Sequence, residues 1–185
     1  GSDPGDPIRQ SLRFRGAQYL VGTNTNTIDD DYTISFWAKL ASSPSDGYNV
    51  LVSSTSAASG TTAQFYLSWY NYSNANDKKL SYFSVATTRS LNPSRDPSAW
   101  YHIVLQQDKT NGRARLFVNG EEFISVSNYS TCAGGVTFGR WSTNSAYILQ
   151  GSYIADAHLV DGQALDPTTF GRTNANGVWV PVDPK

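Results

Sequence analysis

An aspartate and a histidine stand two residues apart inside an apolar run, SYIADAHLVDG at residues 152–162. Such a pair could serve acid–base catalysis or metal binding, but the first also needs a nucleophile or substrate pocket and the second a third ligand. If the run is a strand, Asp156 and His158 lie on the face of Ile154 and Val160. Because a buried carboxylate must be hydrogen-bonded, we expect Asp156 to be a buried scaffold residue that ties adjacent strands or a loop.

Two glutamates are the next candidates for catalysis, since a glycoside hydrolase needs two carboxylates about 5–9.5 Å apart. Glu121 and Glu122 are adjacent in the sequence, and neighbouring residues of a strand point to opposite faces. Most aspartates fall in turn-like segments, and the chain has no Gly-x-Ser-x-Gly elbow and no phosphate-binding loop. We therefore expect the protein not to be an enzyme.

Two stretches combine aromatic rings with amide or guanidinium groups, which suits the binding of a sugar. Residues 67–77 offer Trp69, Tyr70, Asn71 and Tyr72, and residues 139–147 offer Arg140, Trp141, Asn144 and Tyr147. The alternative for each stretch is a structural role, because aromatic residues at strand ends often pack against the core. Trp69 and Tyr70 would point to opposite faces of a strand, so we expect Tyr70, Tyr72 and Trp141 to be the exposed platforms.

Composition argues against several classes of partner. The formal net charge of −1 gives no electrostatic basis for binding nucleic acid. No segment approaches the run of about 20 apolar residues that spans a membrane, so membrane insertion is not expected. Cys132 is the sole cysteine and can form neither an intrachain disulfide nor a cysteine zinc cluster.

The elements that must position these residues are strands. In DYTISFWAKL, residues 31–40, apolar residues alternate with Thr33, Ser35, Trp37 and Lys39, which predicts a half-buried antiparallel strand. Similar runs recur along the chain between turn-like segments, and Asn119-Gly120 predicts a tight hairpin. One short helix is expected near residues 166–170, with Asp166 as its N-cap and Pro167 at its first position.

About ten short strands with short turns predict an all-β fold, a two-sheet antiparallel sandwich of the jelly-roll type. Gly1 and Ser2 are typical of a cloning remnant, and the DPGDP that follows reads as a linker. We expect residues 1–8 to lie outside the fold and residues 9–185 to form a single domain.

The stretch AWYHIVLQQDKTNGRARLFVNGEE, residues 99–122, resembles the central signature of the laminin G-like, concanavalin A-like sandwiches. The matching positions are Trp100, His102, Asp108, Gly112, Leu116, Val118, Asn119 and Gly120. The resemblance extends over roughly residues 9–170 and implies structural roles for Trp100 and His102. Relatives often carry calcium on loops at the sandwich rim. Asn76 and Asp77, or the run from Asp29 to Asp31, could supply some of the six or more oxygen ligands, although solvated turn residues are the alternative.

The segment HLVDGQALDPTTFG, residues 158–171, followed by NGVWVP, is similar to lectin-like domains in structural proteins of tailed bacteriophages, especially marine ones. This resemblance implies a non-catalytic module of a virion protein in a tail or capsid fibre. Its partners would be a host cell-surface glycan and other virion proteins, or it would serve as a structural or decoration domain. The alternative is an extracellular glycan-binding domain, secreted or on the cell surface of a cellular organism.

Overall fold

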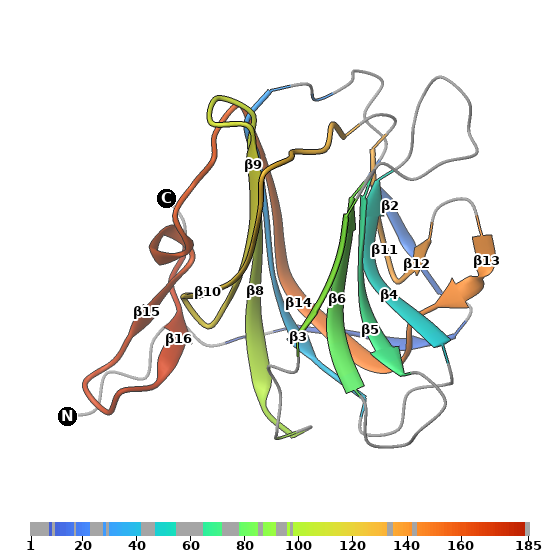
Figure 1. Cartoon of the computed structure of the whole chain (residues 1–185). Helices are drawn as coiled ribbons and strands as arrows, with labels where there is room; N and C mark the ends of the chain where they lie inside the picture. Colours follow the sequence, from blue (N-terminus) through green and yellow to red (C-terminus); the bar gives the residue numbers. More distant parts are fainter. Residues whose placement is uncertain are drawn as a thin grey trace.

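A computed structural model describes residues 8, 10–16, 18–22, 28, 30–41, 47–54, 65–71, 78–84, 87–91, 96, 98–132, 135–141 and 144–183. Two six-stranded antiparallel sheets pack face to face, as the sequence predicts, with a two-stranded ribbon outside each sheet (Figure 1). Within these ranges no helix has the length and apolar character needed to cross a membrane.

The first sheet has the strand order β1-β14-β3-β8-β9-β10. Its strands are β1 (Leu12–Arg15), β14 (Gln150–Asp161), β3 (Tyr32–Lys39), β8 (Trp100–Asp108), β9 (Arg113–Val118) and β10 (Glu121–Val126). The second sheet has the order β2-β11-β4-β5-β6-β7. Its strands are β2 (Leu20–Gly22), β11 (Val136–Phe138), β4 (Gly47–Ser54), β5 (Phe65–Asn71), β6 (Lys78–Ser84) and β7 (Thr87–Leu91).

Two short ribbons complete the fold. One pairs β12 (Arg140–Trp141) with β13 (Asn144–Ile148), and the other pairs β15 (Gly171–Thr173) with β16 (Trp179–Pro181). The predicted short helix is a 3-10 turn, η1 (Pro167–Thr169), whose N-cap Asp166 accepts a hydrogen bond from the Thr168 amide at 3.0 Å. Proline at the first position fixes the backbone angle that this turn requires.

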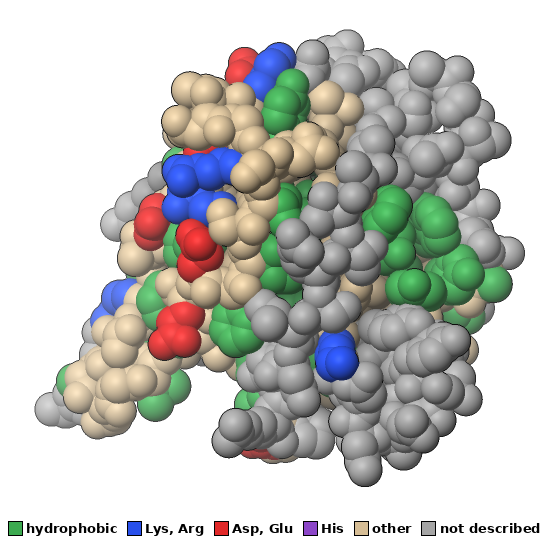
Figure 2. All heavy atoms as spheres, viewed as in Figure 1, with side chains coloured by type: hydrophobic (Ala, Val, Ile, Leu, Met, Phe, Trp, Pro, Cys, Tyr) green, Lys and Arg blue, Asp and Glu red, His purple; other side chains and the backbone are tan. Residues whose placement is uncertain are grey.

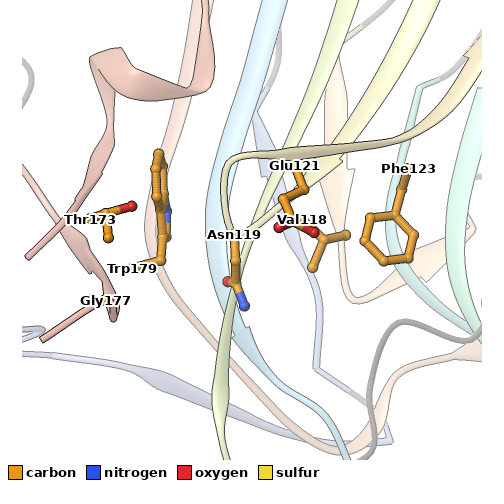
Figure 3. Close-up of a pocket in the computed structure, with 7 residues that line it drawn as sticks. All are labelled: Val118, Asn119, Glu121, Phe123, Thr173, Gly177 and Trp179. Carbon is orange, nitrogen blue, oxygen red and sulfur yellow. The ribbon is translucent and has the colours of Figure 1, made fainter.

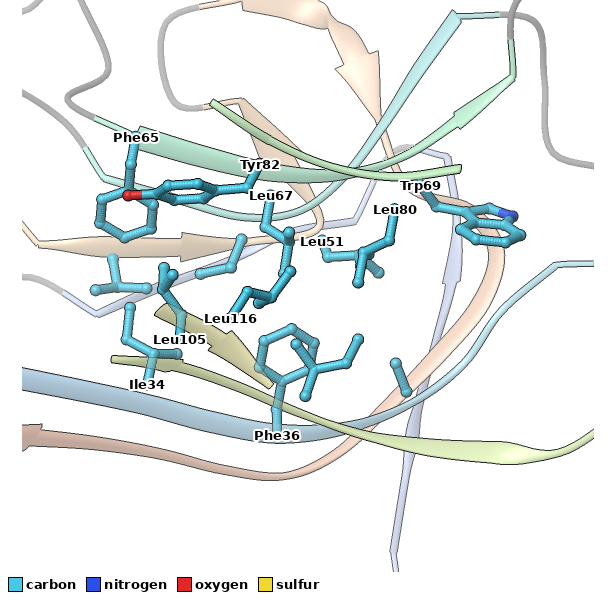
Figure 4. Close-up of a cluster of buried hydrophobic side chains, with 14 of the residues drawn as sticks. Ile34, Phe36, Leu51, Phe65, Leu67, Trp69, Leu80, Tyr82, Leu105 and Leu116 are labelled. Atoms are coloured by element: carbon cyan, nitrogen blue, oxygen red, sulfur yellow. The ribbon is translucent and has the colours of Figure 1, made fainter. Parts of the chain in front are cut away.

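The core lies between the two large sheets and follows the period-two pattern of their strands (Figure 4). Ile34 and Phe36 of β3 face Leu67 of β5 and Leu80 of β6, and all four are fully or almost fully buried. Tyr82 also lies in this core, where its hydroxyl accepts a hydrogen bond from the Gln107 side chain at 2.9 Å.

The other face of β3 is buried too, which differs from the half-buried strand that the alternation predicts. Thr33, Ser35 and Trp37 are each at most 3% exposed. Residues 163–183 cover this outer face: the Thr33 hydroxyl donates to the Gln163 carbonyl at 2.8 Å and accepts from the Leu165 amide at 2.8 Å. The alternation of residues in β3 could not predict this burial, because the segment that packs on its outer face, residues 163–183, comes from the far end of the chain.

The β9–β10 hairpin confirms the Asn119-Gly120 prediction. Asn119 has φ of 51° and Gly120 has φ of 83°, the two positive values that a tight type I′ turn requires. A Cβ on Gly120 would lie 2.5 Å from the Trp179 ring, so the turn also needs glycine for space. The ribbon that contains Trp179 is thereby able to approach the hairpin closely.

Asp156 lies in a bulge of β14, and the expectation that it is buried is wrong. Ala155 pairs with Trp37 and His158 pairs with Ser35, so two residues of β14 lie opposite one residue of β3. Asp156 adopts φ of 50° and is exposed, with its Oδ1 atom 3.1 Å from Nε2 of His158. The extra residue breaks the alternation on which the sequence argument depended.

Candidate functional site

Five aromatic rings form a continuous group on the outer face of the second sheet. We call this group the aromatic cluster: Tyr48 of β4, Tyr66 of β5, Phe83 of β6, Trp141 of β12 and Tyr147 of β13. Tyr66 stacks on Phe83 with ring centres 4.9 Å apart, and Trp141 lies 5.2 Å from Tyr66 and 5.2 Å from Tyr147. Tyr48 meets Tyr147 edge-on at 5.2 Å. The contacts join three strands of the sheet to the β12–β13 ribbon.

Strand alternation explains why these rings point outward. Phe65 and Leu67 enter the core, so Tyr66 between them faces the other side of β5, and Phe83 follows the core residue Tyr82 in the same way. Trp141 and Tyr147 are half-buried and so retain exposed ring surface. Figure 2 shows hydrophobic side chains gathered at the surface in the region of β12 and β13. The indole nitrogen of Trp141 is buried and has no hydrogen-bond partner among the described residues.

Arg140 lies next to the aromatic cluster and is held by two contacts. Its guanidinium carbon lies 3.7 Å from the centre of the Tyr19 ring, a close cation–π contact. Its carbonyl accepts a hydrogen bond from the Ser53 hydroxyl of β4 at 3.1 Å. The first contact holds the guanidinium on the Tyr19 ring and the second holds the backbone of Arg140 on β4, next to Trp141 in the chain, while the residue remains half-buried rather than enclosed.

The structure places the second predicted binding stretch over β4, the strand that pairs with the start of the first stretch. The β12–β13 ribbon with Arg140, Trp141 and Tyr147 lies over β4, and β4 pairs with β5 so that Tyr48 is opposite Tyr70. Only the backbone is described for Tyr70, Asn71 and Asn144, and Tyr72 lies outside the described residues.

Trp69 does not belong to this face, which contradicts its expected place among the ligand-binding residues. It is 2% exposed and lies in the core between the two sheets (Figure 4). Tyr48, Tyr66 and Phe83 belong to the aromatic cluster but are not among the predicted binding residues. The alternation of β5 predicts the position of Tyr66: Phe65, Leu67 and Trp69 share the core face, so Tyr66 must lie on the outer face.

His102 is enclosed on the opposite side of the sandwich, on the outer face of the first sheet. Its ring stacks between Trp37, with ring centres 5.0 Å apart, and Trp179, at 6.0 Å. The Trp179 indole donates to Nδ1 at 3.0 Å, so the proton is on Nε2, which donates to the Ser35 hydroxyl at 2.8 Å. Burial, together with the charge of His158, lowers the pKa of His102 to about 3. A neutral imidazole with both nitrogens engaged is suited to a scaffold, not to proton transfer.

Other signature residues also hold the scaffold. The Asp108 carboxylate accepts from the backbone amide and side chain of Asn111 and from Nε of Arg113, at 2.9–3.0 Å. Burial would raise the pKa of Asp108, but these hydrogen bonds and the Arg113 charge together lower it. Gly112 closes the same turn with φ of 64°. Trp100 is half-buried at the start of β8 and contacts the Tyr153 ring edge-on at 6.5 Å.

A polar groove of about 340 Å³ lies between the β9–β10 turn and the β15–β16 ribbon (Figure 3). It is lined by Val118, Asn119, Glu121, Phe123, Thr173, Gly177 and Trp179. Glu121 provides the single carboxylate among the residues that line the groove. The neighbouring Glu122 points instead to Arg115, with the charged atoms 3.5 Å apart. The lining residues therefore lack the pair of carboxylates that hydrolysis of a glycosidic bond needs.

The described residues include no calcium site formed by either of the two sets of candidate ligands. Asn76 and Asp77 lie outside the described residues. In the part of the chain that the structure describes, no three His, Cys, Asp or Glu side chains are grouped as metal ligands. The Asp31 carboxylate accepts instead from the amide and hydroxyl of Thr110, both at 3.0 Å.

Comparison with known proteins agrees with this architecture. A family model described as the concanavalin A-like lectin/glucanases superfamily matches residues 14–174. A heptameric SAP-like pentraxin from Limulus polyphemus is similar with a TM-score of 0.58 and 17% identity, over 84% of this chain and 77% of the pentraxin. A search of curated protein sequences gives no significant match.

Two further solved structures are similar over part of their length. The sialidase of Trypanosoma rangeli, in complex with sialic acid, gives a TM-score of 0.67 at 13% identity, over 89% of this chain and 27% of the sialidase. A structure of botulinum neurotoxin type C gives 0.56 at 12% identity, over 91% of this chain and 43% of the other. The chain thus spans less than half of either protein, and at these identities the likeness concerns the fold.

Proposed function

We propose that this chain, which belongs to the concanavalin A-like lectin/glucanases superfamily, is a non-catalytic lectin-like module that binds a glycan through the aromatic cluster. The observation that carries the proposal is the continuity of the five rings on the outer face of the second sheet, with Trp141 and Tyr147 half-exposed. Aromatic faces stack on the C–H faces of sugar rings, and nearby amide, hydroxyl and guanidinium groups bond the sugar hydroxyls.

The supporting frame is suited to recognition because it is preformed. Tyr48, Tyr66 and Phe83 come from three neighbouring strands, and each ring touches at least one other ring of the cluster. Rings held on paired strands lose little conformational freedom when a ligand binds, so more of the contact energy appears as affinity. Arg140 adds hydrogen-bond donors at the edge of the same surface.

The absence of catalysis is part of the same proposal. Of the two histidines, His102 is enclosed, and His158 is half-buried next to a strand bulge. The groove beside the β15–β16 ribbon has Glu121 as its single carboxylate. Incubation with β-glucans, agar, alginate or bacterial polysaccharides should release no reducing ends, and cleavage abolished by one carboxylate substitution would contradict this.

We propose that the module belongs to a virion, as a domain of a phage tail or capsid fibre that contacts a host cell-surface glycan and other virion proteins. The support is the similarity of residues 158–171 and of NGVWVP to such domains. A secreted or cell-surface glycan-binding domain is the second candidate. It is favoured by the likeness to botulinum neurotoxin type C, a toxin whose entry into cells depends on interaction with two ganglioside molecules.

A glycan array with the isolated domain tests the binding role, and matched tyrosine variants test the surface. Tyr147→Ala removes a half-buried ring of the aromatic cluster, and Tyr153→Ala removes a half-buried ring of the first sheet. We expect Tyr147→Ala to weaken binding of the array hit by about 1–3 kcal/mol, as for a ring that is a hot spot, and Tyr153→Ala to leave it unchanged. No bound glycan, or equal effects of both variants, would contradict the proposal.

A further inference from the structure

Charge is distributed unevenly between the two sheets. The strands of the second sheet and the β12–β13 ribbon contain four basic residues, Lys78, Lys79, Arg89 and Arg140, and no aspartate or glutamate. The strands of the first sheet contain five basic residues, Arg13, Arg15, Lys39, Arg113 and Arg115, and five acidic ones, Asp108, Glu121, Glu122, Asp156 and Asp161. The whole chain has a net charge of −1, so the basic character of the second sheet is local.

Two of the five basic residues of the first sheet form ion pairs with carboxylates of the same sheet. Arg113 lies 3.0 Å from the Asp108 carboxylate, and Arg115 lies 3.5 Å from Glu122. Arg140, by contrast, has no carboxylate within ion-pair distance among the described residues, and its contacts are the Tyr19 ring and the Ser53 hydroxyl. Nε of Arg140 is buried without a hydrogen-bond partner among the described residues, so the terminal N–H groups of the ring-stacked guanidinium are the donors that can bind a carboxylate or phosphate.

We infer that the aromatic cluster and Arg140 bind an acidic glycan, one that carries carboxylate, sulfate or phosphate groups. This inference rests on the proposed function and assigns the class of its ligand. Trp141 and Tyr147 provide the surface on which a sugar ring can stack. Arg140, the residue next to Trp141, provides a positive charge held in place by the Tyr19 ring. A neutral sugar has no negative group to pair with this charge. An acidic group at this position gains a charge-assisted hydrogen bond, and the strands of the second sheet contain no aspartate or glutamate that would repel it.

The test is an array that holds each acidic glycan beside its neutral form, made by carboxyl reduction or by removal of sulfate or phosphate. We expect the bound glycans to be acidic, and each to bind at least tenfold more tightly than its neutral form in 50 mM salt. The difference should shrink at 500 mM salt, because an ionic contact of this kind is screened. The paired forms also show which acidic group is recognised.

A matched arginine pair locates the effect. Arg140→Gln should remove the preference, so that the acidic and neutral forms of each glycan bind with the same affinity. Arg13→Gln is the control, because Arg13 is also stacked over a tyrosine, Tyr153 at 5.5 Å, but lies in the first sheet. Circular dichroism of both variants checks that each remains folded, and Arg140→Lys should restore part of the preference.

Each outcome decides between the two proposals. Equal binding of acidic and neutral forms, or no effect of Arg140→Gln, overturns the acidic class and leaves the glycan-binding role standing. No binding to any member of the array contradicts the proposed function, and the inference falls with it. Competition by single-stranded DNA at the same phosphate concentration, as effective as the acidic glycan itself, would show a site that responds to charge alone and would also overturn the inference.

Discussion

The imidazole of His102 is held neutral by its surroundings, and this makes folding stability sensitive to pH. Burial is the main cause that lowers its pKa from 6.5 to about 3 in the folded protein. The unfolded chain binds this proton at the ordinary pKa, so acid favours unfolding. Stability contributed by the neutral ring is present above pH 6.5 and is lost as the pH falls from 6.5 towards 3.

We predict that the free energy of unfolding falls between pH 7 and pH 5, by up to about 1.4 kcal/mol per pH unit below 6.5. Urea unfolding at pH 7, 6 and 5 measures the slope. His102→Gln should be less stable at pH 7 but should flatten the slope, whereas His158→Gln, which changes a half-exposed ring, should keep it. An unchanged slope in His102→Gln would contradict the account.

Asp156 shows the limit of residue-level reasoning from sequence. The residues around Asp156 follow the pattern of a strand, which the structure confirms, but one extra residue in β14 moves its carboxylate from the expected interior to the surface. Nothing local marks that bulge, because the left-handed backbone at Asp156 is occupied by a residue other than glycine. The pairing partner that reveals it, β3, is more than a hundred residues away.

At the scale of elements, hairpins and core strands were predictable because their signals are local. Asparagine and glycine both tolerate the positive φ angles of a type I′ turn, so the Asn119-Gly120 pair is enough to predict the hairpin. In the same way, the alternation of β3 identifies Ile34 and Phe36 as core residues. The aromatic cluster was only partly predictable. Its rings come from β4, β5, β6 and the β12–β13 ribbon, and their meeting depends on the register between strands and on how the ribbon folds back.

Gly112 and Gly120 both have positive φ, and replacing each with alanine distinguishes the destabilisation caused by backbone strain from that caused by steric crowding. Gly112→Ala adds a Cβ that meets nothing within 4 Å, so we expect a loss of about 1 kcal/mol from the left-handed backbone alone. Gly120→Ala adds the same strain and a Cβ that would lie 2.5 Å from the Trp179 ring. We expect it to cost about 1–3 kcal/mol more, as overpacking does, in urea unfolding. Equal losses would mean that the β15–β16 ribbon moves away freely.

Over the whole molecule, both outer faces of the sandwich are covered, and the two covers differ in kind. The β15–β16 ribbon and η1 lie outside the first sheet, and the β12–β13 ribbon lies outside the second (Figure 1). Phe170, beside η1, is 2% exposed and packs with Val104 and Phe117 of the first sheet in a separate apolar cluster. The first cover thus buries apolar surface, whereas the second leaves Trp141 and Tyr147 half-exposed.

This difference predicts that the first cover unfolds together with the sandwich. Phe170→Ala removes a ring buried against Val104 and Phe117, so we expect it to lower the free energy of unfolding by about 3–5 kcal/mol. The ¹⁹F resonance of fluorotryptophan at Trp179, assigned among the five tryptophans by substitution, reports on the ribbon, and far-ultraviolet circular dichroism reports on both sheets. Both transitions should shift to lower urea together. Val178→Ala in the same segment is the control, because Val178 is 55% exposed and should change neither curve. If Phe170→Ala moves the transition seen at Trp179 and leaves the circular dichroism transition in place, residues 163–183 are an appendage that opens independently of the sheets.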